Sequence, residues 1–194
     1  MPFNFPIFLT WLRIALIPLM AGVFYLPAGW LTSAQTNLIA TALFGAAAVT
    51  DWLDGYLARR LGQTSAFGAF LDPVADKLMV AAALIVLVDL GRAAAIIALI
   101  VIGREITISA LREWMAQIGK SASVAVSLIG KLKTAMQMAA ILMLLYDMPL
   151  AGFDIPLAGT LLLWLAALLT LVSMAYYLRV AARVLRARPG VDTK

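Results

Sequence analysis

The chain has 194 residues, of which 64% are apolar and only 13% charged, and its mean hydropathy is +0.98. Soluble domains carry about 25% charged residues, so we predict an integral membrane protein with no room for a second, soluble domain. The net charge of +5 then indicates orientation and contact with anionic lipid, not nucleic-acid binding, and the absence of cysteine and histidine excludes disulfides and thiolate chemistry.

Hydrophobic spans follow one another at residues 11–26, 36–60, 71–87, 93–114, 123–146 and 157–178. A helix of about 20 apolar residues crosses a bilayer, and the short polar breaks favour antiparallel neighbours. We therefore predict an all-α integral membrane protein with six transmembrane helices in a single domain over residues 1–190. Within it, residues 1–10 are expected to lie in the membrane interface and residues 179–194 to form a basic cytoplasmic tail.

The basic residues predict the orientation of these spans. Of the 15 lysines and arginines, only Arg92 falls at the ends opposite to all the others. Cytoplasmic loops carry the excess of basic residues, so both termini are expected in the cytosol.

The N-terminal apolar stretch also loosely resembles a cleavable signal sequence. It is longer than a usual signal core, and the basic region before it is thin. We therefore expect the first span to remain in the protein.

Four of the ten acidic residues lie within one short stretch, as Asp51, Asp54, Asp72 and Asp76. Each pair has helical spacing and shares a helix face, so two antiparallel helices bring all four together near the cytoplasmic boundary. Clustered carboxylates repel one another and call for a cation. Without histidine or cysteine, oxygen ligands favour Mg²⁺ or Mn²⁺, in a two-metal site of the kind that clamps phosphates. The alternative is a set of solvated acids at helix ends.

Three neighbours of the aspartates fit a phosphate ligand. Gly55 and Gly68 remove side chains where a ligand or another backbone comes close. Arg59 can grip a phosphate with two hydrogen bonds.

The pattern Asp51-x-x-Asp54-Gly55-x-x-Ala58-Arg59, followed by Gly68-x-x-x-Asp72-x-x-x-Asp76, resembles the signature of the CDP-alcohol phosphotransferase family. The resemblance implies a homodimer in a bacterial inner membrane, with a two-metal site facing the cytoplasm. It implies transfer of a substituted phosphate from a CDP-linked donor to an alcohol, with release of CMP. In its terms all four aspartates are metal ligands and Asp76 is also the base, while the CDP part of the donor is held by Gly55, Ala58, Arg59 and Gly68.

Basic residues recur in the second half, as Arg104 and Arg112 on one span and Lys131 and Lys133 at the start of the next. They favour an anion site, although flanking charges of a membrane protein are the plainer interpretation. Arg104 could instead pair with an acid.

The second half also resembles the phosphatidylglycerophosphate synthase branch of that family. The resemblance is carried by Arg104-Glu105, Leu111-Arg112-Glu113 and Gly130-Lys131-x-Lys133-Thr134-x-x-Gln137, together with Thr10-x-x-Arg13. It implies CDP-diacylglycerol as donor and glycerol 3-phosphate as acceptor. The acceptor phosphate would then be bound by Arg112, Lys131, Lys133 and Arg104, and Thr10 and Arg13 would lie on the donor side.

Two alternatives stay open at this stage. A relative with the same chemistry could use inositol phosphate or phosphatidylglycerol as acceptor. An ion-coupled transporter could use buried aspartates, but it predicts acids near the bilayer midplane and broken helices there. Here the acids fall at span ends beside arginines.

Overall fold

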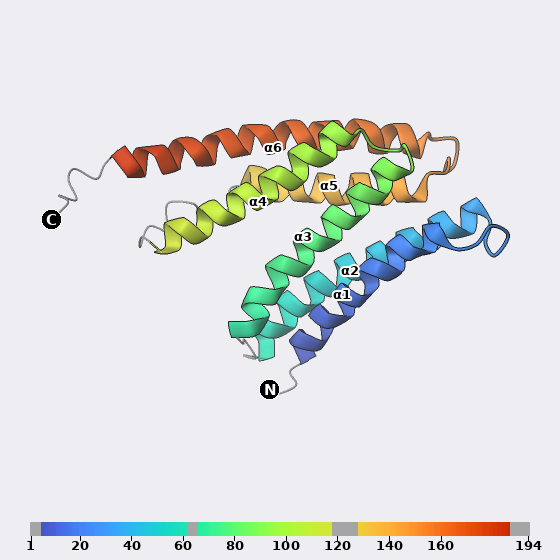
Figure 1. Ribbon diagram of the computed structural model, residues 1–194, viewed down its shortest axis with the longest axis horizontal. Coiled ribbons are helices and arrows are strands. Elements are labelled where there is room, and N and C mark those ends of the chain that lie inside the picture. Colours follow the sequence, from blue (N-terminus) through green and yellow to red (C-terminus); the bar gives the residue numbers. More distant parts are fainter. Residues whose placement is uncertain (1–4, 62–65, 118–127, 187–194) are drawn as a thin grey trace.

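The computed structural model describes residues 5–61, 66–117 and 128–186, and over these ranges the chain is helical, with no β-strand. The all-α prediction is confirmed for this part of the chain. The elements, labelled in Figure 1, are α1 (Phe5–Gly22), the 3₁₀ turn η1 (Val23–Tyr25), α2 (Ser33–Leu61), α3 (Ala66–Asp89), α4 (Ala95–Gln117), α5 (Leu128–Tyr146) and α6 (Ile155–Arg186).

The ends of two helices differ from the prediction. α1 begins at Phe5, six residues before the expected span, because Pro6 lies in its first turn, where a missing N–H breaks no helical hydrogen bond. α6 continues to Arg186, so the first half of the predicted basic tail extends the last helix. The expected start of the fifth span, at residue 123, lies outside the described residues.

The helices form two groups of three (Figure 1). α1 packs against α2 and α3, while α6 packs against α4 and α5, and contacts of α2 with α5 and of α3 with α4 join the groups. The groups converge at the turns after α1, α3 and α5 and diverge toward the opposite helix ends. All six helices contribute to one buried apolar cluster, which includes Met20, Phe44, Leu84, Ile97, Ile141 and Leu163.

Arg92 fastens the end where the groups converge. Its Nε pairs with Asp147 at 3.0 Å, and its Nη2 donates to Asn37 Oδ1 at 2.9 Å. Its Nη1 donates to the carbonyls of Leu144 and Leu145, which end α5 and have no partner within the helix. One cation therefore ties α2 and α5 to the turn between α3 and α4.

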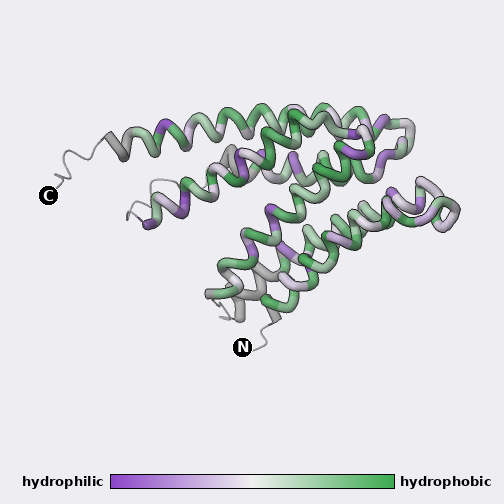
Figure 2. The backbone as a smooth tube through the Cα atoms, viewed as in Figure 1, coloured by the Kyte–Doolittle hydropathy of each residue, from purple (hydrophilic) through white to green (hydrophobic). Residues whose placement is uncertain are grey.

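Two helical segments are long and apolar enough to cross a membrane, Ile7–Tyr25 and Ile155–Ala182. Only 22% and 28% of their most apolar windows are buried, so most of their apolar surface faces outward. Figure 2 shows that α6 is largely apolar along its length, and Leu161, Trp164 and Leu168 on this helix are exposed. A soluble bundle would bury such faces, so this surface is that of a membrane protein.

The close packing of α5 and α6 depends on Gly159. A Cβ added there would lie 2.9 Å from Met143 Cβ and 3.1 Å from Leu144 Cγ, whereas at Gly103 it would meet nothing within 4 Å. We expect Gly159→Ala to destabilise the protein by about 1–3 kcal/mol through overpacking. Gly103→Ala should leave stability equal or raise it by up to about 1 kcal/mol, since alanine favours helix. Thermal unfolding in detergent measures both, and equal midpoints would contradict the packing argument.

Candidate functional site

Arg13 of α1 lies between two of the predicted aspartates. Its side chain is fully buried, and its Nη1 contacts Asp51 Oδ1 at 2.9 Å and Asp76 Oδ1 at 2.5 Å. Asp51 comes from α2 and Asp76 from α3, and both side chains are a little under half exposed. One guanidinium therefore neutralises carboxylates from two different helices.

Thr10 reaches the same group of acids from one turn earlier on α1. Its Oγ1 donates to Asp72 Oδ1 at 2.6 Å. Thr10 and Arg13 are three residues apart and share one face of α1, as Asp72 and Asp76 share one face of α3. Two residues expected on the donor side thus contact three of the aspartates directly.

The remaining predicted residues of this half divide between α2 and α3. Gly68 is buried on α3. Four lie on α2 with side chains outside the described residues: Asp54, Gly55, Ala58 and Arg59.

The donor set suits a hard divalent cation. Among the described side chains no three acids form a metal-binding group, but Asp51 and Asp76 each place an oxygen against the same nitrogen. They are therefore already arranged around one positive charge. Carboxylate oxygens are the ligands that Mg²⁺ and Mn²⁺ prefer, and the residues present fit such an ion.

Two of the four predicted cations, Arg104 and Lys133, meet around an acid, Glu105. Glu105 Oε1 accepts hydrogen bonds from Lys133 Nζ of α5 at 2.5 Å and from the neighbouring Arg104 Nη1 of α4 at 3.1 Å. Lys133 is 1% exposed and Arg104 7%. Buried cations need such a partner, because an isolated charge is costly to remove from water. Lys131 lies at the start of α5, and its side chain is outside the described residues.

Residues of α6 contact the two arginines of α4. Arg104 Nη2 donates to Ser173 Oγ at 3.3 Å. The guanidinium carbons of Arg104 and Arg112 lie 5.9 Å and 5.7 Å from the centre of the Tyr177 ring, within cation–π range. The three helices α4, α5 and α6 thus hold the cations as α1, α2 and α3 hold the acids.

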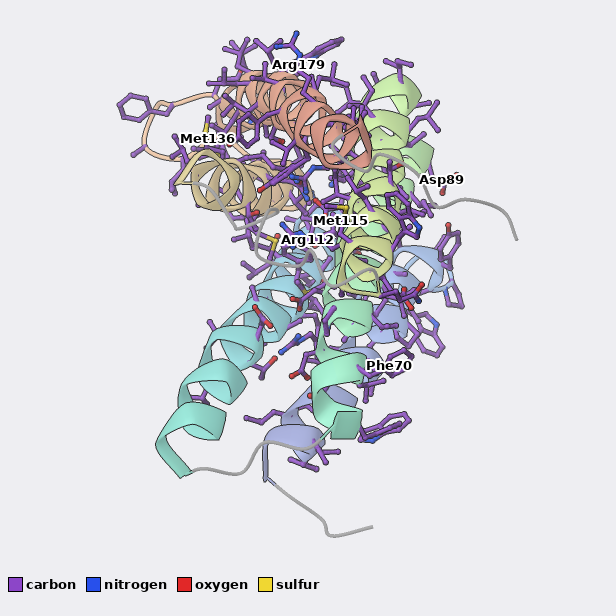
Figure 3. The ribbon with its side chains drawn as sticks, turned by 90° about the vertical axis from the view of Figure 1, so that its left-hand side faces the viewer. Phe70, Asp89, Arg112, Met115, Met136 and Arg179 are labelled. Atoms are coloured by element: carbon purple, nitrogen blue, oxygen red, sulfur yellow. The ribbon has the colours of Figure 1, made fainter. Side chains whose placement is uncertain are left out.

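Two cavities lie where the halves meet. The large cavity, of about 570 Å³, runs between α3 and α4 and is lined by residues that include Asp76, Lys77, Arg104 and Arg112. Phe70 and Arg112, on two of its walls, are labelled in Figure 3. The small cavity, of about 260 Å³, is lined by Asp51, Asp76, Lys77, Met79, Val80, Glu105, Thr134, Gln137 and Met138. It brings the aspartates of one half to the charged cluster of the other.

Sequence reasoning gave no site role to several of these residues. Glu105 was noted only as the neighbour of Arg104, and Lys77 only as a flanking charge, yet both line the two cavities. Ser173 and Tyr177 were taken as part of an apolar span. A buried polar residue in such a span was the available signal for Ser173, since it needs a partner.

The chain is similar to one protein family and to named bacterial proteins. A family model described as CDP-alcohol phosphatidyltransferase matches residues 3–172. A protein of Escherichia coli strain K12, named CDP-diacylglycerol–glycerol-3-phosphate 3-phosphatidyltransferase, is 49% identical over 183 residues, which cover 93% of this chain and 96% of that protein. A protein of the same name from Salmonella choleraesuis strain SC-B67 is 48% identical over the same lengths.

Removal of the buried counter-charge should make the aspartates more dependent on a divalent cation. We expect Arg13→Met to lower the unfolding free energy without metal by about 1–3 kcal/mol, since two carboxylates lose a partner. Added Mg²⁺ should then raise the melting temperature more than in the wild type, because the freed carboxylates bind it in the folded state. Arg179→Met, on exposed surface, is the matched control. If Mg²⁺ raises the melting temperature of both variants equally, the ion does not take the place of the Arg13 charge.

The Glu105–Lys133 pair should behave as a coupled unit. Glu105→Gln and Lys133→Met should each destabilise the protein, and the double variant should lose less than the two losses together. We expect a coupling free energy of about 0.5–3 kcal/mol. Glu113→Gln, exposed on the same helix, should change stability by less than about 0.5 kcal/mol. Strictly additive losses in chemical unfolding would show that the pair contributes nothing as a pair.

Proposed function

Since the chain belongs to the CDP-alcohol phosphatidyltransferase family, we propose that it transfers the phosphatidyl group of CDP-diacylglycerol to glycerol 3-phosphate, giving phosphatidylglycerophosphate and CMP. The observation that carries this proposal is the large cavity, which has Asp76 of α3 on one wall and Arg104 and Arg112 of α4 on another. An acceptor with a hydroxyl at one end and a phosphate at the other needs both kinds of wall. Relatives at 48–49% identity over 93% of the chain carry this activity in their names.

The aspartate half would hold the reacting groups of the donor. Mg²⁺ or Mn²⁺ bound by Asp51, Asp54, Asp72 and Asp76 would supply positive charge to the pyrophosphate and to the leaving CMP. Gly55, Ala58, Arg59 and Gly68 would bind the cytidine and pyrophosphate, with Thr10 and Arg13 orienting the acids that they contact.

Asp76 is the proposed base. Its carboxylate takes the proton of the attacking hydroxyl, whose oxygen forms a bond to the phosphatidyl phosphorus. The bond from that phosphorus to CMP breaks, and its electron pair leaves with CMP. Arg13 holds one oxygen of Asp76 in place, so the contribution of this residue is mainly its position.

The cation half would bind the acceptor phosphate. Arg104, Arg112, Lys131 and Lys133 are the proposed ligands; free serine or inositol would not need them. Arg104 and Lys133 both donate hydrogen bonds to Glu105. This common partner fixes the guanidinium and ammonium groups relative to each other before the acceptor binds.

We further propose that all six helices span a bacterial inner membrane, with both termini and the site on the cytoplasmic side, in one domain over residues 1–190. The basic helix ends at this side support that orientation. The donor's acyl chains would stay in the bilayer while its head meets the soluble acceptor. A homodimer is proposed from the resemblance to the family.

The proposal is tested by CMP release in detergent micelles that contain CDP-diacylglycerol and Mg²⁺. Glycerol 3-phosphate, inositol phosphate, serine and phosphatidylglycerol are offered in turn. We expect release with glycerol 3-phosphate alone, a fall in kcat of about 10²–10⁴-fold in Asp76→Asn, and a raised KM for the acceptor in Lys133→Met. Arg179→Met should retain full activity.

Other outcomes would separate the parts of the proposal. Release with a different alcohol would keep the aspartate chemistry and refute the assignment of the acceptor. If no alcohol gives metal-dependent release, the enzyme assignment fails and ion-coupled transport becomes the hypothesis to test.

A further inference from the structure

The side-chain oxygen of Gln137 on α5 is a buried hydrogen-bond acceptor. The residue is 2% exposed, and among the described residues its Oε1 is buried with no hydrogen-bond partner. A buried acceptor in this state destabilises the folded protein. Native proteins keep few such atoms, and each calls for an explanation such as a ligand.

The position of Gln137 points to a ligand in the small cavity. Gln137 lines that cavity together with Asp76 from α3 and Glu105 from α4. It lies four residues after Lys133, so both side chains project from one face of α5. Lys133 is itself bound to Glu105, which lines the same cavity.

One group of the proposed acceptor has no binding residue assigned to it so far. Glycerol 3-phosphate carries a phosphate at one end, an attacking hydroxyl at the other and a second hydroxyl on the middle carbon. Arg104 and Arg112, which line the large cavity, take the phosphate, and Asp76, which lines both cavities, takes the attacking hydroxyl. The middle hydroxyl neither reacts nor carries charge, and when binding removes it from water it needs a hydrogen-bond partner.

We propose that Gln137 recognises this middle hydroxyl, through a hydrogen bond that the hydroxyl donates to Oε1. The inference rests on the proposed function and makes Gln137 a specificity-determining residue of it. Gln137 and Asp76 both line the small cavity, of about 260 Å³, so one acceptor molecule bound at Asp76 lies within reach of Gln137. Oε1 has almost no exposed surface, and rotation about the broad terminal torsion of glutamine turns it toward the cavity.

The proposed bond explains how the enzyme would tell one small phosphate ester from another. A site that hydrogen-bonds a substrate hydroxyl rejects an analogue without it far better than an apolar site senses a missing methylene. The middle carbon is also the stereocentre of glycerol 3-phosphate. Recognition of its hydroxyl therefore favours one enantiomer, while the phosphate and the terminal hydroxyl are the same in both.

The test compares two acceptors on the same protein preparation, so that any loss of folded protein cancels in the ratio. The acceptors are glycerol 3-phosphate and 1,3-propanediol monophosphate, which lacks only the middle hydroxyl. The wild type should prefer glycerol 3-phosphate in kcat/KM by roughly tenfold or more. In Gln137→Met, which is unbranched and of similar length, the preference should fall toward unity. Thr134→Val, on the same cavity, should keep it, as should Gln137→Glu, which retains an accepting oxygen.

Thermal unfolding without substrate gives a second readout. Gln137→Met replaces an unpartnered polar group with an apolar one of similar shape, so its melting temperature should equal or exceed that of the wild type. A clearly lower melting temperature would show that Oε1 has a structural partner and would overturn the inference.

Two kinetic results would also overturn it. In the first, Gln137→Met slows both acceptors by the same factor, which is the signature of a merely structural role. In the second, Thr134→Val, and not Gln137→Met, abolishes the preference. A wild type that releases CMP with neither acceptor would refute the proposed function itself and this inference with it.

Discussion

The need to pair charges inside an apolar helix bundle governs this structure. Arg13 lies fully buried on an otherwise apolar helix, and it is tolerated because Asp51 and Asp76 meet it from two other helices. Glu105 does the same for Arg104 and Lys133 in the other group of helices. Without fixed partners these charges would cost several kcal/mol each. The contacts that hold the helices together are therefore also the contacts that arrange the chemistry.

Each half of the site carries an internal counter-charge of the same sign as the ligand proposed for it. Arg13 is positive and lies among acids suited to a divalent cation; Glu105 is negative and lies among cations suited to a phosphate. A bound divalent cation would take over the role of Arg13, and a bound phosphate the role of Glu105. The acids and the cations that surround these two residues are therefore already oriented before a ligand binds. Preorganisation of this kind reduces the cost of ordering and desolvation on binding.

Local spacing predicted that Asp72 and Asp76 share a helix face, because residues four apart do so wherever that helix packs, and both contact α1. Spacing could not give the destination of Arg13, whose partner Asp76 is 63 residues away, nor the shared use of Glu105 by two helices. The predicted span began at residue 11, whereas α1 begins at Phe5 and includes more than half of the segment expected to lie in the membrane interface; Pro6 lies in its first turn, where proline is tolerated. Hydropathy alone also has a limit, since among the described residues it marks long apolar segments only in α1 with η1 and in α6. The helices between them carry most of the charged residues of the site, and these charges lower their hydropathy.

The two ends of the helix bundle have different roles: one holds the helices together, and the other is where the helix groups separate. At one end Arg92 ties α2, α5 and the turn after α3 into a fixed cluster. From there the two helix groups diverge (Figure 1), and they are joined by contacts of α2 with α5 and of α3 with both α4 and α5. The small cavity is lined by those same four helices. The distance from Asp76 to Gln137 is therefore set by the joints between the groups, since the two residues belong to different groups. An acceptor that contacts both residues would add one more joint, made by the substrate itself.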